Sequence, residues 1–250
     1  LPQCSVKLRL TKGVHLVIDR KRLPTSDAVV LTEGSRVLFV IPWMERVILG
    51  TTDTDYDGVI EDVHTESEDI LYILGVLNEA FPGVNLTKKD VISHWAGLRP
   101  LIADPNGKPS DISRAHEIHE PLKGWFDVAG GKLTTYRLMA EQTVDRILPR
   151  LDRPTRPCST ATTPLLRTEE TDGISAIVPP EPSRSLVEHF CRNEWAGSLT
   201  DVMVRRSSWH YYCKNADAVA QQAATWMGDV LGWDEARRTA EWTDYRKFRE

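Results

Sequence analysis

The chain has 250 residues, a formal net charge of −5, 41% hydrophobic residues and 27% charged residues. This balance is typical of a soluble globular protein with one large core or two moderate ones. The negative charge argues against nucleic acid as the main partner, because a phosphate backbone requires a basic surface. A local basic pocket that binds a small anion is still compatible with this net charge.

The cysteines indicate neither a disulfide framework nor a metal site. They form no CxxC pair and no cluster with histidine, so we interpret them as buried, reduced thiols of a cytoplasmic protein. They are Cys4, Cys158, Cys191 and Cys213. No apolar run reaches the roughly 18 residues of a membrane span, and there is no secretory signal at the start. Any membrane contact is therefore expected to be peripheral.

Strand signals dominate the first fifty residues. The stretches 6–19 and 27–43 alternate β-branched and polar residues, with breaks predicted at Gly13 and Gly34. Residues 36–51 predict a β-hairpin, because a short connection separates two strongly apolar runs. The chain enters this alternation without an initiating methionine, which predicts that it is a piece of a longer protein.

A helix is predicted over residues 66–81. Apolar residues recur there at helical spacing, Ser67 is the expected N-cap, and Pro82 ends the pattern. Residues 88–102 predict a strand that passes into a loop within the sequence WAGLRP.

Two further strands and a helix follow. The strands are predicted at 113–120 and 124–130, and the helix at 134–148. The residues of this helix available to a core are Tyr136, Leu138, Met139, Val144, Ile147 and Leu148.

The composition changes after this helix. Residues 149–170 are rich in proline, serine, threonine and arginine and are typical of a connector. Beyond them only helical periodicity remains, at 183–193, 198–207, 215–231 and 234–249. We therefore expect a mixed α/β domain at 1–155 and an all-helical domain at 156–250.

The stretch FDVAGGKLTTYRLMAEQ joins a strand to a helix through Gly130, Gly131 and Lys132. The glycines permit a close backbone approach, and the first-turn N–H groups of the helix face whatever binds there. Lys132 adds a positive charge, and Thr134 or Thr135 can cap the helix. This pattern favours a polar or partly anionic ligand. A tight turn with a solvated lysine and a threonine cap explains the same residues.

The same stretch resembles the pattern G-G-K-x-x-[small polar]-Y-R-x-x-A of FAD-dependent glycerol-3-phosphate dehydrogenases. The matching residues are Gly130, Gly131, Lys132, Thr135, Tyr136, Arg137 and Ala140. Three more stretches resemble this family in the same order: 12–19, 37–58 and 95–102, and the likeness continues loosely through 198–209. The family's N-terminal fingerprint, G-x-G-x-x-G, is absent from this sequence. The resemblance implies the C-terminal portion of such an enzyme, with a mixed-sheet substrate-binding domain before the helical one.

The resemblance also implies a cofactor and a reaction. The cofactor is FAD, and the reaction is oxidation of sn-glycerol 3-phosphate to dihydroxyacetone phosphate, with electrons passing on to a quinone. In such flavoenzymes the glycine turn faces the pyrimidine edge of the flavin, where a helix N-terminus stabilises the negative charge of the reduced form. The candidate flavin contacts are Gly130, Gly131, Lys132, Leu133 and Thr134.

The substrate needs cations for its phosphate and a base for its hydroxyl. By resemblance, Arg99 matches an active-site arginine and Lys132 a substrate or flavin contact. His15 matches a pocket histidine and is the candidate general base, and Arg114 is a further phosphate-binding candidate. Structural alternatives are an ion pair of Arg99 with a carboxylate such as Asp104, and a core position for His15.

Other polar and aromatic groups have simpler explanations. Residues 51–53 follow a strand, where a site or an ordinary turn can form. No metal site is expected from Asp111, His116 and His119, because H-x-x-H on a strand places the two rings on opposite faces. The aromatic run 209–212 fits a helix end that packs inward better than a membrane contact.

The last predicted helix, 234–249, is charged nearly all round and is expected to be a solvated face. Three functional hypotheses remain open: a dehydrogenase that reduces a quinone, an oxidase that reduces oxygen, and a non-catalytic module that has kept the fold. Because the dinucleotide fingerprint is absent, we expect the isolated chain to hold FAD weakly and to be inactive. Peripheral contact with the cytoplasmic face of the inner membrane, and a homodimer, are compatible with the resemblance.

Overall fold

The computed structural model divides the chain into two compact units. Unit 1 comprises residues 1–13, 53–64 and 96–165, and unit 2 comprises residues 14–52, 65–95 and 166–250. Strands β1 and β6 each contribute residues to both units. The residues that the structure describes are 6–34, 36–103, 115–151, 156–165, 168–171, 173–174 and 177–249.

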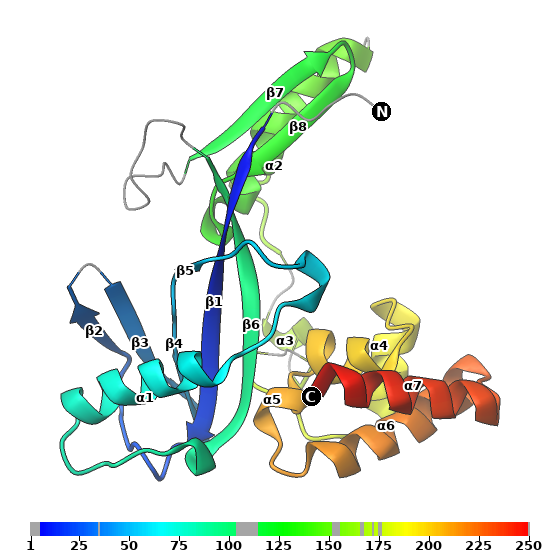
Figure 1. Ribbon diagram of the computed structural model, residues 1–250. Helices are drawn as coiled ribbons and strands as arrows, with labels where there is room; N and C mark the ends of the chain where they lie inside the picture. Colours follow the sequence, from blue (N-terminus) through cyan, green and yellow to red (C-terminus); the bar gives the residue numbers. More distant parts are fainter. Residues whose placement is uncertain are drawn as a thin grey trace. The chain divides into compact units, whose positions relative to one another are not determined.

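The elements follow one another as a strand-rich half and a helical half (Figure 1). The strands are β1 Leu8–Asp19, β2 Val29–Glu33, β3 Arg36–Trp43, β4 Arg46–Gly50, β5 Thr54–Asp55, β6 Val91–Ile102, β7 His116–Leu122 and β8 Trp125–Gly130. The α-helices are α1 Ser67–Ala80, α2 Tyr136–Ile147, α3 Thr168–Thr171, α4 Arg184–Asn193, α5 Trp209–Tyr212, α6 Ala216–Leu231 and α7 Glu235–Arg249. Shorter helical turns are η1 Ile60–Asp62, η2 Lys88–Asp90, η4 Leu133–Thr135, η5 Leu148–Leu151 and the π-helical η6 Asp201–Arg206.

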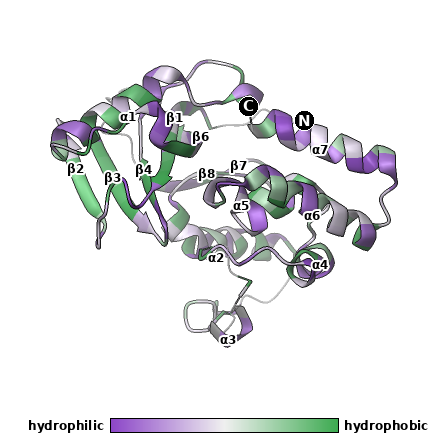
Figure 2. Ribbon diagram, turned by 90° about the horizontal axis from the view of Figure 1, so that it is seen from below, coloured by the Kyte–Doolittle hydropathy of each residue, from purple (hydrophilic) through white to green (hydrophobic). Residues whose placement is uncertain are grey.

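The larger sheet has the strand order β2-β3-β4-β1-β5, and β6 also pairs with β1. The hairpin predicted over 36–51 is confirmed: β3 and β4 pair antiparallel, with Val40 opposite Leu49. Strands β2, β3 and β4 are strongly hydrophobic, as Figure 2 shows. In unit 2 the side chains of this sheet and of α1 that are at most 3% exposed include Leu16, Ile18, Leu38, Val40, Leu49, Ile73, Leu74 and Leu77.

Three local expectations were wrong. Helix α1 is capped by Glu66, whose backbone N–H bonds the Asp69 carboxylate at 2.9 Å, and Ser67 is already its first helical residue. Gly13 does not interrupt β1, which runs without a break from Leu8 to Asp19. Strand β6 continues to Ile102, so Arg99 lies on a strand and not in a loop.

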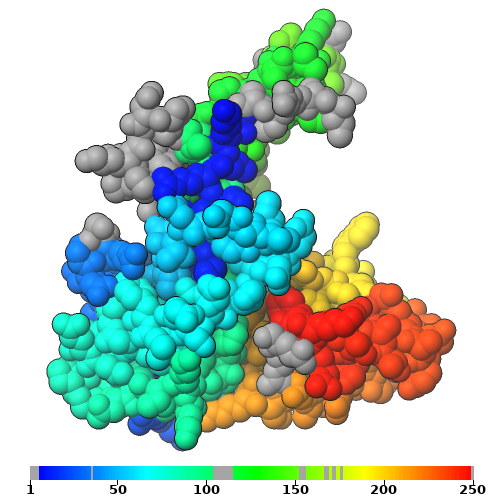
Figure 3. All heavy atoms as spheres, viewed as in Figure 1, coloured from blue at the N-terminus to red at the C-terminus, as the bar shows by residue number. Residues whose placement is uncertain are grey.

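The helical part of unit 2 has its own core. Trp209 and Phe190 are fully buried there, which confirms the inward-packing interpretation of the aromatic run. The last helix, α7, is not simply a solvated face: Tyr245 is fully buried and its hydroxyl bonds His210 Nδ1 at 3.0 Å. Figure 3 shows α6 and α7 side by side, with their outer surfaces open to solvent.

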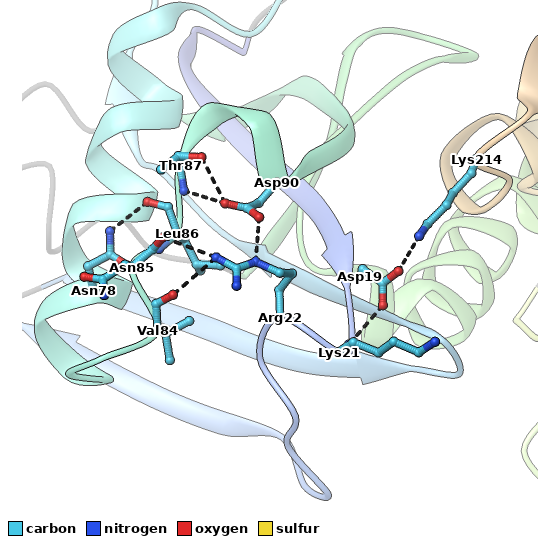
Figure 4. Close-up of polar contacts among 10 residues, drawn as sticks. All are labelled: Asp19, Lys21, Arg22, Asn78, Val84, Asn85, Leu86, Thr87, Asp90 and Lys214. Carbon is cyan, nitrogen blue, oxygen red and sulfur yellow. Dashed lines mark hydrogen bonds and ion pairs between the residues drawn. The ribbon is translucent and has the colours of Figure 1, made fainter.

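Polar contacts anchor the ends of the unit 2 strands (Figure 4). Arg22 donates to Asp90 Oδ1 at 2.6 Å, just before β6 begins. Lys214, from the helical half, forms an ion pair with Asp19 at the end of β1. In both cases the cation lowers the pKa of the carboxyl group. These contacts and residues 166–250 belong to the same compact unit, unit 2.

Unit 1 contains the antiparallel hairpin β7–β8, with α2 packed against it. Gln142 of α2 bonds His116 at 2.6 Å, and Arg146 donates to the carbonyl of Ile118. The apolar face predicted for this helix is not buried among the described residues: Tyr136 is 59% and Val144 50% exposed. Three of the other predicted residues, Met139, Ile147 and Leu148, are half-buried, so the helix covers its apolar face only in part.

The cysteines are less buried than predicted. Cys158 is exposed, whereas Cys191 and Cys213 are half-buried, and all three are free thiols. Cys4 lies outside the described residues. No described helix is long and apolar enough to cross a membrane.

Candidate functional site

The glycine turn after β8 requires both of its glycines. Gly130 and Gly131 have φ angles of +73° and +81°, which side-chain-bearing residues rarely adopt. A Cβ on Gly130 would lie 2.7 Å from the carbonyl oxygen of Ala115, and one on Gly131 would lie 2.4 Å from Met139 Sδ. The glycines therefore let the turn lie close to other parts of the chain, at Ala115 and Met139.

The helix start behind the turn has four successive backbone N–H groups, of which the first two bond within the protein. The N–H of Gly131 bonds the carbonyl of Ala115 at 3.3 Å, and the N–H of Lys132 bonds Thr135 Oγ1 at 3.1 Å. Thr135 is thus the capping threonine. The N–H groups of Leu133 and Thr134 donate to no described residue, and Leu133 is 89% exposed. These two donors at a helix start fit the electron-rich edge of a flavin.

Lys132 lies at the same turn with an exposed side chain. Among the residues that the structure describes, no carboxylate lies within ion-pair distance of its ammonium group. A cation with no carboxylate partner among the described residues suits an anionic ligand at this place.

Arg99 lies in unit 1 on β6, beside β1. Its Nη1 donates to Asp53 Oδ1 at 3.2 Å, so a carboxylate does hold it. The predicted partner Asp104 lies outside the described residues. The guanidinium also lies against Gly13: a Cβ built there would be 2.3 Å from Nη2. The side chain keeps 35% of its surface exposed, so a ligand can reach it.

His15 lies in unit 2 on β1, and its side chain makes an aromatic stacking contact. Its imidazole stacks on Trp95 of β6, with centroids 4.9 Å apart and planes at 14°. It also lies over Gly50, its cross-strand partner in β4, where a Cβ would come within 2.5 Å of Cδ2. On a strand between two others, this imidazole is fixed from both neighbouring strands.

The stack on His15 continues into the helical half. Trp95 contacts Tyr211 of α5 with centroids 4.9 Å apart, and Ser93 Oγ donates to the Tyr211 carbonyl at 2.7 Å. Burial raises the pKa of the Tyr211 phenol, so its hydroxyl stays neutral at physiological pH. The helix α5 therefore supports the ring that supports His15.

Residues 51–53 divide into structural and candidate functional positions. Thr52 is buried and its Oγ1 accepts the backbone N–H of Val14 at 3.0 Å, which completes the strand ladder. Asp53 holds Arg99, which sequence reasoning missed because the two residues are 46 positions apart. The supporting roles of Gly13, Gly50, Trp95 and Tyr211 were missed as well, although Gly13 lies two residues before His15 and Trp95 four residues before Arg99.

Two further candidates cannot be placed. Arg114 and Asp111 lie outside the described residues. His116 bonds Gln142, and His119 pairs with Glu117 at 2.8 Å. Within the described part of the chain, no three metal-ligating side chains gather at binding distance.

Comparison with known proteins defines the class. The model of the family "FAD dependent oxidoreductase" matches residues 1–174, and that of the "C-terminal domain of alpha-glycerophosphate oxidase" matches residues 178–238. The chain therefore belongs to the FAD-dependent oxidoreductases, whose cofactor is FAD, and it carries the helical domain that follows in the glycerophosphate-oxidising members.

Individual proteins similar to this chain give more specific comparisons. The chain is 46% identical over 149 residues to the aerobic glycerol-3-phosphate dehydrogenases of Staphylococcus aureus strains USA300 and NCTC 8325, an alignment that covers 59% of this chain and 27% of theirs. It is also similar to the X-ray structure of the glycerol-3-phosphate dehydrogenase from Bacillus halodurans complexed with FAD. That similarity has a TM-score of 0.79 and 30% identity, and it covers 98% of this chain and 57% of the other. The chain thus matches only part of the length of each relative.

Proposed function

We propose that this chain supplies the substrate side and the flavin-edge contacts of an enzyme that oxidises sn-glycerol 3-phosphate to dihydroxyacetone phosphate. The observation that carries the proposal is the Gly130-Gly131-Lys132 turn with two open N–H donors, in a chain that belongs to the FAD-dependent oxidoreductases. The similarity to glycerol-3-phosphate dehydrogenases supports the choice of substrate.

Each candidate residue has a chemical role in this reaction. FAD, when bound, supplies the acceptor for the hydride from C2. The N–H groups of Leu133 and Thr134 and the ammonium of Lys132 stabilise negative charge at the flavin edge. Arg99 binds an anionic oxygen of the substrate, and the imidazole of His15 takes the proton of the C2 hydroxyl. One hydride and one proton leave, which turns the alcohol into a ketone.

The division of labour along the chain is part of the same proposal. Residues 1–155 form the substrate-binding and partial FAD-binding domain, and residues 156–250 form the helical domain. No G-x-G-x-x-G sequence is present to hold the ADP half of FAD, so the 250-residue chain alone binds FAD weakly and turns over no substrate. Titration of the purified chain with FAD, followed by flavin fluorescence, measures this affinity directly.

The activity itself is tested in the enzyme that carries this chain, or in a chimera with the part of the Bacillus halodurans enzyme that this chain does not match. Glycerol 3-phosphate should reduce a quinone analogue in the presence of FAD, and glycerol should not. Absence of turnover in both proteins, with FAD bound, contradicts the proposal and favours the non-catalytic module.

A glycerol-3-phosphate oxidase is the second candidate, favoured by the match of residues 178–238 to the C-terminal domain of alpha-glycerophosphate oxidase. An oxidase releases one hydrogen peroxide per substrate oxidised, whereas the proposed dehydrogenase reduces the quinone and binds the membrane peripherally on its cytoplasmic face. Peroxide release and flotation with vesicles that contain quinone distinguish the two.

A further inference from the structure

Two contacts of Arg99 with described residues have no assigned role so far. One is the backbone of Gly13 on the neighbouring strand β1, and the other is the carboxylate of Asp53 at 3.2 Å from Nη1. Both contacts lie within unit 1. Among the contacts with described residues, the guanidinium therefore has the backbone of Gly13 beside it and the carboxylate of Asp53 at one of its nitrogens.

The Gly13 contact is tight at the functional end of Arg99. A Cβ on Gly13 would lie 2.3 Å from Nη2 and 2.7 Å from Cζ, and real Cβ atoms do not come so close to other atoms. The atoms in the way form the tip of a flexible side chain, so the clash can be relieved when the guanidinium moves and the strand stays. A methyl group at Gly13 is thus expected to move the Arg99 guanidinium with little cost to the fold.

We propose that Gly13 and Asp53 are positioning residues, which aim the Arg99 guanidinium at an anionic oxygen of the substrate. This inference rests on the proposed function of Arg99. A planar fork binds an oxyanion well in only a narrow range of orientations. Displacement of a substrate-positioning group by about 1 Å can cost on the order of 100-fold in rate.

Gly13→Ala and Asp53→Ala in the FAD-loaded enzyme that carries this chain test the inference. Each should lower kcat/KM for glycerol 3-phosphate by about tenfold to 100-fold, with a melting temperature close to wild type. A rise in KM places Arg99 on the substrate phosphate, and a fall in kcat places it on the developing C2 oxygen. Asp53→Asn keeps an oxygen acceptor for Nη1 and should retain most of the activity.

Two control variants match these changes. Gly75→Ala adds a methyl group at an exposed helical glycine with open space around it. Asp55→Ala removes another exposed carboxylate from the same sheet, which binds Arg9 Nε at 2.8 Å and does not contact Arg99. Both should keep wild-type kcat/KM.

A second readout does not depend on activity. In the 250-residue chain, the Nε–Hε NMR signal of Arg99 should shift in Gly13→Ala and Asp53→Ala, and stay in place in Asp55→Ala. If Arg99→Ala lowers kcat/KM and neither positioning variant does, the inference is wrong while the proposed function stands. If Arg99→Ala itself has no effect, the assigned role of Arg99 in the proposed function is wrong.

Discussion

The side chains of Arg99 and His15 are positioned in a similar way but by different partners. Each candidate side chain lies over a glycine of an adjacent strand, Gly13 for Arg99 and Gly50 for His15. Arg99 is otherwise fixed by a half-exposed carboxylate, whereas His15 is fixed by the stacked ring of Trp95. The first arrangement can adjust to a ligand, and the second is built into the packing of its unit.

This difference predicts which substitutions change kinetics alone and which also change stability. At Gly13 an added methyl meets only the tip of a long side chain, but at Gly50 it meets the His15 ring and, at 2.9 Å, the carbonyl oxygen of Val14. A backbone atom cannot move aside as a side-chain tip can. Changes near Arg99 should therefore affect kinetics, and changes near His15 should affect kinetics and folding together.

The largest effect is expected for Arg99→Ala. Loss of a charged donor at the substrate should lower kcat/KM by at least about 100-fold, or about 3 kcal/mol of transition-state stabilisation. The exposed ion pair with Asp53 contributes little to folding, so the free energy of unfolding should change by less than about 1 kcal/mol. Steady-state kinetics and urea denaturation measure the two quantities. An unchanged kcat/KM would remove Arg99 from the site.

Trp95→Ala should disrupt the packing around His15. It removes the ring between His15 and Tyr211, so we expect a loss of about 2–3 kcal/mol in the free energy of unfolding together with lower activity. Trp95→Phe keeps an aromatic surface and should recover most of both. Trp125→Ala, at a partly exposed tryptophan of β8, serves as the control. Equal stability of Trp95→Ala and wild type would contradict a packed support for His15.

Gly50→Ala sharpens the comparison with Gly13→Ala. Overpacking against the Val14 carbonyl and the His15 ring should cost about 1–2 kcal/mol of stability, measured by urea denaturation. Gly13→Ala should cost clearly less. If the two variants lose the same stability, the distinction between a movable and a fixed neighbour is wrong.

The smallest effect concerns pH and the ion pairs at the strand ends. Lys214 lowers the pKa of Asp19, so this pair contributes stability above the unfolded carboxyl pKa of about 4 and loses it as the pH falls through the folded pKa. Lys214→Met should reduce the acid-dependent loss by less than about 1 kcal/mol. Lys21→Met, which keeps the backbone N–H bonded to Asp19, should follow wild type. Identical pH curves for Lys214→Met and wild type would show that the pair contributes nothing.

The local sequence pattern predicted strands and helices well where one type of signal was strong. The hairpin at 36–51, the helix near 66–81 and the strands around Gly124 follow from alternation, periodicity and turn residues. Sequence could not show that β6 runs through Arg99, because the glycine and proline of WAGLRP resemble loop residues. Nor could it show that α2 leaves its apolar face partly exposed, since periodicity reports amphipathicity and not the neighbour.

The candidate site was predictable only as separate residues. Resemblance gave His15, Arg99 and the glycine turn, each from a short motif. Asp53 bonds Arg99, and Tyr211 contacts Trp95, the ring stacked on His15; both come from far along the chain, and long-range pairs leave no local signal. The glycines beneath Arg99 and His15 carry no chemistry of their own, so their roles emerge only from the distances in the fold.

The most direct test of the central claim is anaerobic reduction of bound FAD by glycerol 3-phosphate in the enzyme that carries this chain. We predict that the flavin colour bleaches with glycerol 3-phosphate and persists with glycerol, and that Arg99→Ala slows bleaching at least about 100-fold at low substrate concentration. A flavin that stays oxidised with glycerol 3-phosphate, or that bleaches equally fast in Arg99→Ala, would contradict the claim.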